Sequence, residues 1–550
     1  MAGGTFIPPE GIARSMQARP AKWWGWGFED RSVPLESKPA LLALLRQVLE
    51  LPPTDLLPVP DPETIRLPPS RLSNAELAEF RKIIGEEGIA ASDRDRLTHG
   101  TGRSYRDLIR LRLGPIPPPP DLVLFPEGDE DIRRLLEFCS EKEVRVIPFG
   151  GGTSVVGGVE VVDASRPHIT IDLRRMRRVL AVDEMSLLAT AQAGIRGPLL
   201  EEELGAHGLT VGHFPQSFEF STLGGWIASR SSGALSNRYG KIEDLVAGLR
   251  LVAPSGVYDM QSRPRHAMGP DLLGLAVGSE GALGVITQAT IRVHRAPEAR
   301  AFESFLFRSF HDGLEALRGM AQDGVPAHMT YLMDEDETRL AAATAGGSGS
   351  RTARGGSLLL IGYEGSRGLV RDHLAAGRRY CGAGSAAGPG PAEGWFRERY
   401  DTPYLRDSLI DHRIMVDTVE TATTWSNLER LYEGARKALL TGIWGTGVQG
   451  LVGCHVSHVY TEGASLYFTF LARQKRGDEI PQYDAVKAAA TRAILDLGGH
   501  LSHHHGVGVE HVKYLREAIG DESWRLLRDL KRTLDPKGIM NPGKVYAVGA

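Results

Sequence analysis

The sequence of 550 residues is poor in the features that mark disulfide-rich, membrane-spanning and nucleic-acid-binding proteins. Its three cysteines, Cys139, Cys381 and Cys454, lie far apart, so neither a disulfide framework nor a cysteine metal site is indicated. No apolar run reaches the length of a membrane span, and the net charge of −4 gives no reason to expect a nucleic-acid partner. The N-terminal residues show no charged segment followed by an apolar one, so we expect no signal peptide. We therefore expect a cytoplasmic protein in a reducing compartment.

What the sequence does contain is an ordinary globular composition, with 24% charged and 42% hydrophobic residues. A chain of this length should form two or three domains. Glycine is abundant, at 65 residues, and the first informative pattern lies where glycines cluster.

A short apolar strand runs into three consecutive glycines within the stretch Val144–Gly158. Glycines let successive backbone N–H groups point into one concavity, which suits a diphosphate, and Thr153 and Ser154 add hydroxyl donors. Neither the Walker nor the Rossmann spacing is present, and a flexible glycine-rich loop is the alternative. The residues that we expect to bind the anion are Pro148, Gly150, Gly151, Gly152, Thr153 and Ser154.

Three further stretches follow in order: Pro215–Gly233, Gly278–Thr287 and Leu534–Lys544. Together with the first, they resemble the FAD domain of the vanillyl-alcohol-oxidase type flavoproteins. The resemblance implies an α+β fold with a two-subdomain FAD-binding domain, a mixed α/β cap and a short C-terminal return to the FAD domain. It adds these cofactor-binding residues: Gln216, Ser217, Ser221, Thr222, Gly224, Gly225, Glu280, Gly281, Gly284, Val285 and Ile286.

The FAD is expected to be non-covalent. Relatives that attach the flavin through this loop place a histidine within it, whereas residues 148–158 contain neither histidine nor cysteine.

The expected division is an N-terminal, mostly helical segment over 1–116, the FAD-binding domain over 117–297, the cap over 298–497 and a C-terminal segment over 498–550. Ser73 and Glu76 form a capping-box pattern that predicts a helix to about Ile84. Periodicity predicts a helix over 129–141 and strands over 122–125, 144–148, 169–173 and 289–293.

Three other stretches have plainer interpretations. The arginine-rich segment 93–114 is expected to be a solvated connection, and the tryptophans of 22–27 to be a packing cluster. Residues 341–356 predict a mobile loop. Its Arg351 and Arg354 could contact a lipid surface, although a plain insertion is the simpler interpretation.

His503, His504 and His505 stand in a row and are candidates for acid–base chemistry, because imidazole titrates near neutral pH. On an extended segment, His503 and His505 would share a face that His504 opposes. A metal site and a structural histidine cluster are the alternatives. We expect no metal, because metal ligands usually come from separated positions.

Tyr467 and Arg406 are two further candidates. The alternation over 463–470 places Tyr467 on the face opposite to Leu466 and Phe468, where a phenol could move a proton or simply fill the core. Arg406 lies on an apolar segment and suits bidentate binding of phosphate or carboxylate; a salt bridge with Asp401 or Asp407 is the alternative.

The segments around these residues resemble the alkyl-dihydroxyacetone-phosphate synthases, from about Lys22 to Lys544. The resemblance implies that Tyr467, His503, His504 and His505 are catalytic and that Arg406 holds the substrate phosphate. It implies exchange of the acyl chain of acyl-dihydroxyacetone phosphate for a long-chain alcohol, an ether-lipid reaction without net redox change. With this reaction we expect small lipid substrates, a homodimer and peripheral contact with the inner face of the membrane. The alternative is an FAD-dependent 2-hydroxy-acid dehydrogenase.

Two positions depart from the synthase pattern. Tyr331 stands where those synthases have an arginine, and His455 replaces the arginine that follows their cysteine. The headgroup or the reaction could therefore differ.

Overall fold

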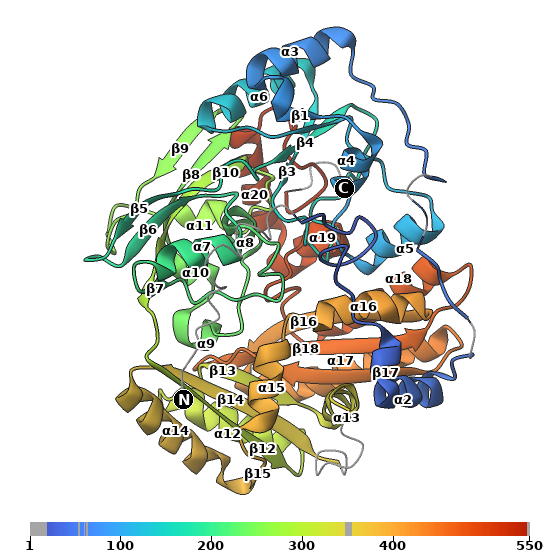
Figure 1. The fold of residues 1–550 in the computed structure, drawn as a ribbon, viewed down its shortest axis with the longest axis vertical. Coiled ribbons are helices and arrows are strands. Elements are labelled where there is room, and N and C mark those ends of the chain that lie inside the picture. The colour runs from blue at the N-terminus through green and yellow to red at the C-terminus, as the bar shows by residue number, and fades with distance from the viewer. Residues whose placement is uncertain (1–18, 53–54, 60, 62–63, 347–354, 547–550) are drawn as a thin grey trace.

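The computed structural model describes residues 19–546, except 53–54, 60, 62–63 and 347–354. Figure 1 shows two halves: one holds a four-stranded and a five-stranded sheet, and the other holds a seven-stranded sheet. This is the α+β arrangement that the sequence predicts.

The first sheet has the order β1-β2-β4-β3, with β2, β4 and β3 parallel. Helix α6 packs on it because its apolar face, Ile132, Leu135, Leu136 and Cys139, is buried. The capping box at Ser73 and Glu76 is present at the start of α3. The bounds are β1 Ile89–Ala90, β2 Leu122–Leu124, β3 Arg145–Phe149, β4 His168–Asp172, α3 Asn74–Ile84 and α6 Asp129–Lys142.

The second sheet is antiparallel, with the order β5-β6-β10-β8-β9. Helix α8 begins after Thr222, whose side chain accepts from the amide of Gly225. The bounds are β5 Val179–Asp183, β6 Leu188–Gln192, β8 Val246–Ala253, β9 Gly256–Met260, β10 Val285–Arg292, α7 Gly197–Gly205 and α8 Leu223–Ser229.

The cap sheet is antiparallel, with the order β15-β12-β14-β13-β17-β18-β16. Helices α2, α13, α16, α17 and α18 pack against its strands or each other. The strands are β12 Ala299–Phe307, β13 Met329–Met333, β14 Ser357–Gly365, β15 Ser385–Ala386, β16 Ile414–Thr424, β17 Gly450–Val456 and β18 Gly463–Arg473. The helices are α2 Pro39–Leu49, α12 Phe310–Gln322, α13 Glu335–Thr344, α14 Arg367–Tyr380, α15 Gly390–Glu398, α16 Thr402–Asp411, α17 Trp425–Gly445 and α18 Glu479–Asp496.

The C-terminal segment returns through α19 (Gly508–Ile519) and α20 (Asp521–Leu534) to the half that holds the four- and five-stranded sheets. Because the resemblance predicts the cofactor there, we call it the FAD half. The amide of Val146 donates to the Ile539 carbonyl at 2.9 Å, and the amide of Asn541 donates to the Val146 carbonyl at 2.8 Å. The end of the chain thus lies against β3, the strand that leads into the glycine stretch.

The arginine-rich segment 93–114 is not a solvated connection, and this prediction was wrong. It forms α4 (Asp93–Thr98) and α5 (Tyr105–Leu113), and Arg96, Arg103 and Arg112 are buried. Burial is tolerated because these guanidinium groups donate to backbone carbonyls, such as those of Pro120, Lys22 and Trp24. The tryptophans do form packing clusters, with Trp23 and Trp26 almost fully buried.

The predicted loop over 341–356 is partly helical, because Ala341–Thr344 complete α13. Alanines favour helix, and the glycine-rich run starts only afterwards. Arg351 and Arg354 lie outside the described residues. Among the helices that the structure describes, none combines the length and the apolar character needed to cross a membrane.

Candidate flavin and substrate site

A cavity of about 1090 Å³ lies where the two halves meet. Residues from both halves form its wall, as do Leu41 and Leu45 of α2. Every residue predicted to bind the cofactor lines this cavity: Pro148, Gly150, Gly151, Gly152, Thr153, Ser154, Gln216, Ser217, Ser221, Thr222, Gly224, Gly225, Glu280, Gly281, Gly284, Val285 and Ile286.

The glycine stretch has the form of an anion cradle. Within the described chain, the amides of residues 150–155 donate to no protein acceptor, so they are available to a ligand. The glycines are needed because the loop lies against the backbone of 220–222. A Cβ at Gly151 would stand 2.3 Å from the Phe220 carbonyl oxygen, and one at Gly150 would stand 2.4 Å from Thr222 Oγ1. The cradle therefore fits the diphosphate of a dinucleotide such as FAD.

The glycine stretch connects to the histidine segment through Glu280. The Glu280 carboxylate accepts hydrogen bonds from the amides of Val507, at 2.5 Å, and Gly508, at 2.8 Å. Burial raises the pKa of Glu280, and these two bonds oppose that rise. Glu280 therefore lines the cavity and also holds residues 507–508 in place.

A second buried carboxylate, Glu420 of β16, holds the histidines themselves. It accepts from Ser502 Oγ at 2.6 Å and from the amides of His503, His504 and His505 at 2.5, 3.2 and 2.9 Å. Burial alone would raise the pKa of Glu420, but the three imidazoles bring it well below its ordinary value. We call residues 502–508 the histidine loop.

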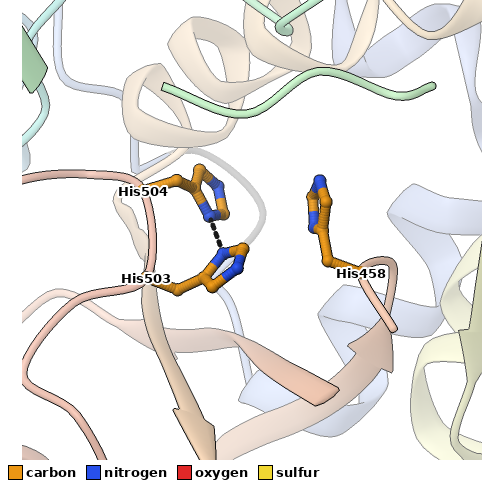
Figure 2. A group of neighbouring side chains, drawn as sticks. All are labelled: His458, His503 and His504. Atoms are coloured by element: carbon orange, nitrogen blue, oxygen red, sulfur yellow. Dashed lines mark hydrogen bonds between the residues drawn. The ribbon is translucent and has the colours of Figure 1, made fainter. Parts of the chain in front are cut away.

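The expected extended conformation of the histidine loop is wrong, because three consecutive amides converge on one carboxylate. His504 and His505 line the cavity. His503 turns away, and its Nε2 lies 2.6 Å from the Tyr460 hydroxyl while its Nδ1 lies 2.9 Å from Nδ1 of His504 (Figure 2). Burial lowers the pKa of His504 to about 3, so its imidazole is neutral at pH 7.

His458, His503 and His504 lie close enough together to hold a metal ion, since one nitrogen of each falls within 4.8 Å of the others (Figure 2). The rings have protein partners without one, however. His458 Nδ1 lies 2.9 Å from Ser457 Oγ, and its Nε2 lies 3.3 Å from the Gly233 carbonyl. The ammonium of Lys241 also binds the His503 carbonyl at 2.7 Å, which opposes a further cation. The absence of a metal stays a prediction.

Tyr467 lies on the same face of the cap sheet as Glu420, because the two residues pair directly across β18 and β16. Leu466 and Phe468 are buried on the other side, as the alternation predicts. The Tyr467 ring lies 5.9 Å from that of His504 and 5.4 Å from that of His505. Burial raises its pKa above the ordinary value, so the phenol is neutral at pH 7.

Arg406 of α16 also lines the cavity and forms neither of the salt bridges that were the alternative interpretation. Asp401 pairs with Arg31, and Asp407 pairs with Lys22 at 3.1 Å. Arg406 donates from Nη2 to the Arg103 carbonyl at 2.7 Å, and its buried Nε has no partner. The Nε is closed to the cavity, but Nη1 has no acceptor among the described residues, so this part of the guanidinium is suited to an anionic ligand at the cavity wall.

Sequence reasoning missed Glu420 and Glu337, and it noted His455 only as a departure from a pattern. Glu420 lies on an alternating strand, and nothing near it in the sequence marks it. Its role follows from strand pairing with Tyr467 and from a loop more than eighty residues away. The available signal was only that β16 carries two carboxylates, Asp417 and Glu420, among apolar and hydroxyl residues.

Comparison with known proteins places this geometry in context. Residues 120–259 match the family described as FAD binding domain, and residues 296–545 match the FAD linked oxidases, C-terminal domain. The chain is 35% identical to alkyldihydroxyacetonephosphate synthase of Dictyostelium discoideum, over 95% of this chain and 93% of that protein. Identity to the synthase of Trypanosoma brucei brucei is also 35%, over 95% and 92%. A solved structure of an alkyldihydroxyacetonephosphate synthase is 33% identical, covers 95% of this chain and 98% of that one, and superposes with a TM-score of 0.83.

Proposed function

The chain belongs to the alkyldihydroxyacetonephosphate synthase family and is an FAD-dependent enzyme, and from this we propose the reaction that it catalyses. It exchanges the acyl chain of acyl-dihydroxyacetone phosphate for a long-chain alcohol, with no net redox change. The product is an ether-linked ketone phosphate, and the acyl chain leaves as a carboxylate.

One observation carries this proposal: a single cavity joins the flavin cradle, a guanidinium that forms no salt bridge with a described residue, and an apolar wall. Arg406 provides the charge that a phosphate needs. An alkyl chain requires a long apolar surface, and it is available on α2, α13 and the cap strands. The residues of this apolar wall are Leu41, Leu45, Met333, Leu340, Ala341, Ala345, Leu358 and Leu360.

The residues divide the work as follows. Arg406 holds the phosphate and so fixes the distance of the reacting carbon from Tyr467. Tyr467 first passes its phenol proton to the neutral imidazole of His504 or His505, which lie beside its ring, and the resulting phenolate takes a proton from that carbon. FAD, held by the glycine cradle, supplies an electron sink when bound. Glu420 and Glu280 keep the histidine loop in place.

One experiment distinguishes this reaction from the alternative, that of an FAD-dependent 2-hydroxy-acid dehydrogenase. The protein is mixed anaerobically with acyl-dihydroxyacetone phosphate and a long-chain alcohol, or with 2-hydroxy acids. Ether product with no lasting flavin bleaching is the expected result. Lasting bleaching by a hydroxy acid, without ether product from the lipid substrates, would contradict the proposed function.

Replacement of Arg406 with lysine tests the phosphate contact. Lysine keeps the charge but loses the planar fork, so substrate binding should weaken by about 1.5–3 kcal/mol, or roughly 10- to 100-fold. Steady-state kinetics should show this in the KM for phosphorylated substrate, and inorganic phosphate should compete less well than with the parent protein. Flavin content should not change.

Arg300→Lys is the matched control, because Arg300 pairs with Glu364 away from the cavity. It should alter the melting temperature and leave the KM unchanged. If Arg406→Lys behaves in the same way, Arg406 does not bind the substrate phosphate.

The FAD linkage gives a second prediction. We propose non-covalent FAD, because residues 148–158 offer neither imidazole nor thiol to the flavin ring. Acid precipitation should release all the yellow colour into the supernatant, measured by absorbance. Flavin retained in the washed pellet would show a covalent bond.

We also propose a homodimer and peripheral contact with a membrane. Sedimentation measurements test the first, and vesicle-binding measurements test the second.

A further inference from the structure

Tyr331, Glu337 and His455 form a hydrogen-bonded group on the cavity wall. His455 of β17 lies with Nδ1 2.7 Å from Glu337 Oε1, and the Tyr331 hydroxyl donates to the same oxygen at 2.8 Å. The Tyr331 and His455 rings stack at 4.0 Å. An ionised carboxylate only accepts hydrogen bonds, so Nδ1 of His455 carries the hydrogen and Nε2 is left as an acceptor.

Two atoms of this group lack protein partners. Glu337 Oε2 is buried and has no hydrogen bond. His455 Nε2 has no hydrogen bond to any described residue. Unlike Glu337 Oε2, it is not fully buried, so it is open to the cavity that His455 lines. Both atoms are acceptors, and buried acceptors without donors are costly. Glu337 Oε2 is closed to the cavity, so the acceptor that a ligand can reach is His455 Nε2, which is complementary to a donor such as a hydroxyl.

The group lies between the apolar wall and Tyr467. On one side, Glu337 shares α13 with Leu340 and Ala341 of that wall. On the other side, the His455 ring stacks on Tyr467 at 4.7 Å, because the two residues pair directly across β17 and β18. An alkyl chain on the apolar wall would thus bring its polar end to His455, next to the proposed reaction centre.

We propose that Tyr331, Glu337 and His455 form the binding site for the hydroxyl end of the alcohol, and that His455 is its general base. This inference rests on the proposed function. The alcohol donates its O–H to His455 Nε2, and Glu337 holds the ring in the tautomer that can accept it. As the alcohol oxygen bonds to the carbon that carried the acyl ester, its proton passes to Nε2. The old C–O bond breaks, its electron pair leaves with the carboxylate, and the proton is later released to solvent.

Binding without turnover tests the site first. Equilibrium dialysis compares 1-dodecanol with dodecyl methyl ether, which has the same chain but no O–H, on the flavin-loaded protein. The alcohol should bind about 3- to 10-fold more tightly, the range for one hydrogen bond. In His455→Phe, which keeps a stacked ring, the preference should vanish. Equal affinities in the parent protein, or a preference kept by His455→Phe, would overturn the site.

Turnover then tests the base. In His455→Ala, kcat/KM for the alcohol should fall by about 10²–10⁴-fold, the range for losing a general base. The KM for the phosphorylated substrate and the flavin content should be unchanged. Added imidazole should restore activity, whereas pyrrole, with the same shape and no basic nitrogen, should not. Rescue by both would mean that His455 only fills space.

His311→Ala is the matched control, because His311 also pairs with a glutamate, Glu429, but on the exposed surface. Its activity should equal that of the parent.

The proposed function and the proposed alcohol site can fail independently of each other. Alcohol preference without ether product would contradict the function and leave the binding site standing. Ether product without preference or base-specific rescue would overturn the site alone.

Discussion

Replacement of Gly151 with valine is expected to abolish FAD binding while leaving the cap folded. A Cβ at this position would lie 2.3 Å from the Phe220 carbonyl oxygen and 2.9 Å from the Ser221 Cα, both backbone atoms that cannot turn aside. The glycine stretch would have to move away from residues 220–222, and the amides of 150–155 would no longer form one cradle. The variant should purify colourless, with no flavin absorbance and no turnover.

The control for this prediction is Gly128→Val at the start of α6. Gly128 has an extended backbone, and nothing lies within 4 Å of an added Cβ, so flavin content should be normal. Circular dichroism and thermal melting show whether Gly151→Val still folds. A folded variant with full flavin content would mean that the glycine stretch does not hold the cofactor.

Replacement of Tyr467 with phenylalanine is expected to lower turnover by about 10²–10⁴-fold, the range for losing a proton-transfer group. The ring contacts with His455, His504 and His505 would remain, so only the hydroxyl is removed. Burial keeps the phenol neutral at pH 7, so its own proton must leave before it can take one from the substrate. His504 lies beside the ring in its neutral form, because burial lowers its pKa, and is placed to receive that proton. The measurement is single-turnover formation of ether product.

Tyr239→Phe provides the comparison. The Tyr239 hydroxyl donates to Glu364 at 2.6 Å, and neither residue lines the cavity. It should change the melting temperature and leave turnover intact. Should Tyr467→Phe retain full turnover with normal flavin content, the proton transfer belongs to another group, and His504 and His455 would be the next to replace.

The FAD half could be predicted well from the sequence because its signals are local. The glycines of 150–152 are required by close backbone approach, and the apolar face of 129–142 follows helical periodicity. The alternation over 463–470 likewise placed Tyr467 on the opposite side of its strand from Leu466. In each case the signal lies within a few consecutive residues, even where the contact that requires it, such as that of Gly151 with Phe220, comes from a distant part of the chain.

The carboxylates on the cap side of the site could not be predicted, because the residues that they hold lie far from them along the chain. Glu420 acts on His503–His505 only once β16 and β18 are paired, and Glu337 reaches His455 across more than a hundred residues. The buried arginines of 93–114 were misjudged for the same reason. Their partners are carbonyls such as that of Pro120, and composition cannot show such partners.

The histidine loop also limits how this fold can be recombined. Its amides at 503–505 are held by Glu420 of the cap, and those at 507–508 are held by Glu280 of the FAD half. A chimera that took its FAD half from one protein and its cap from another would leave this loop with one foreign anchor. Both glutamates and the loop must therefore be inherited as a set, and the two modules cannot diverge independently where they share it.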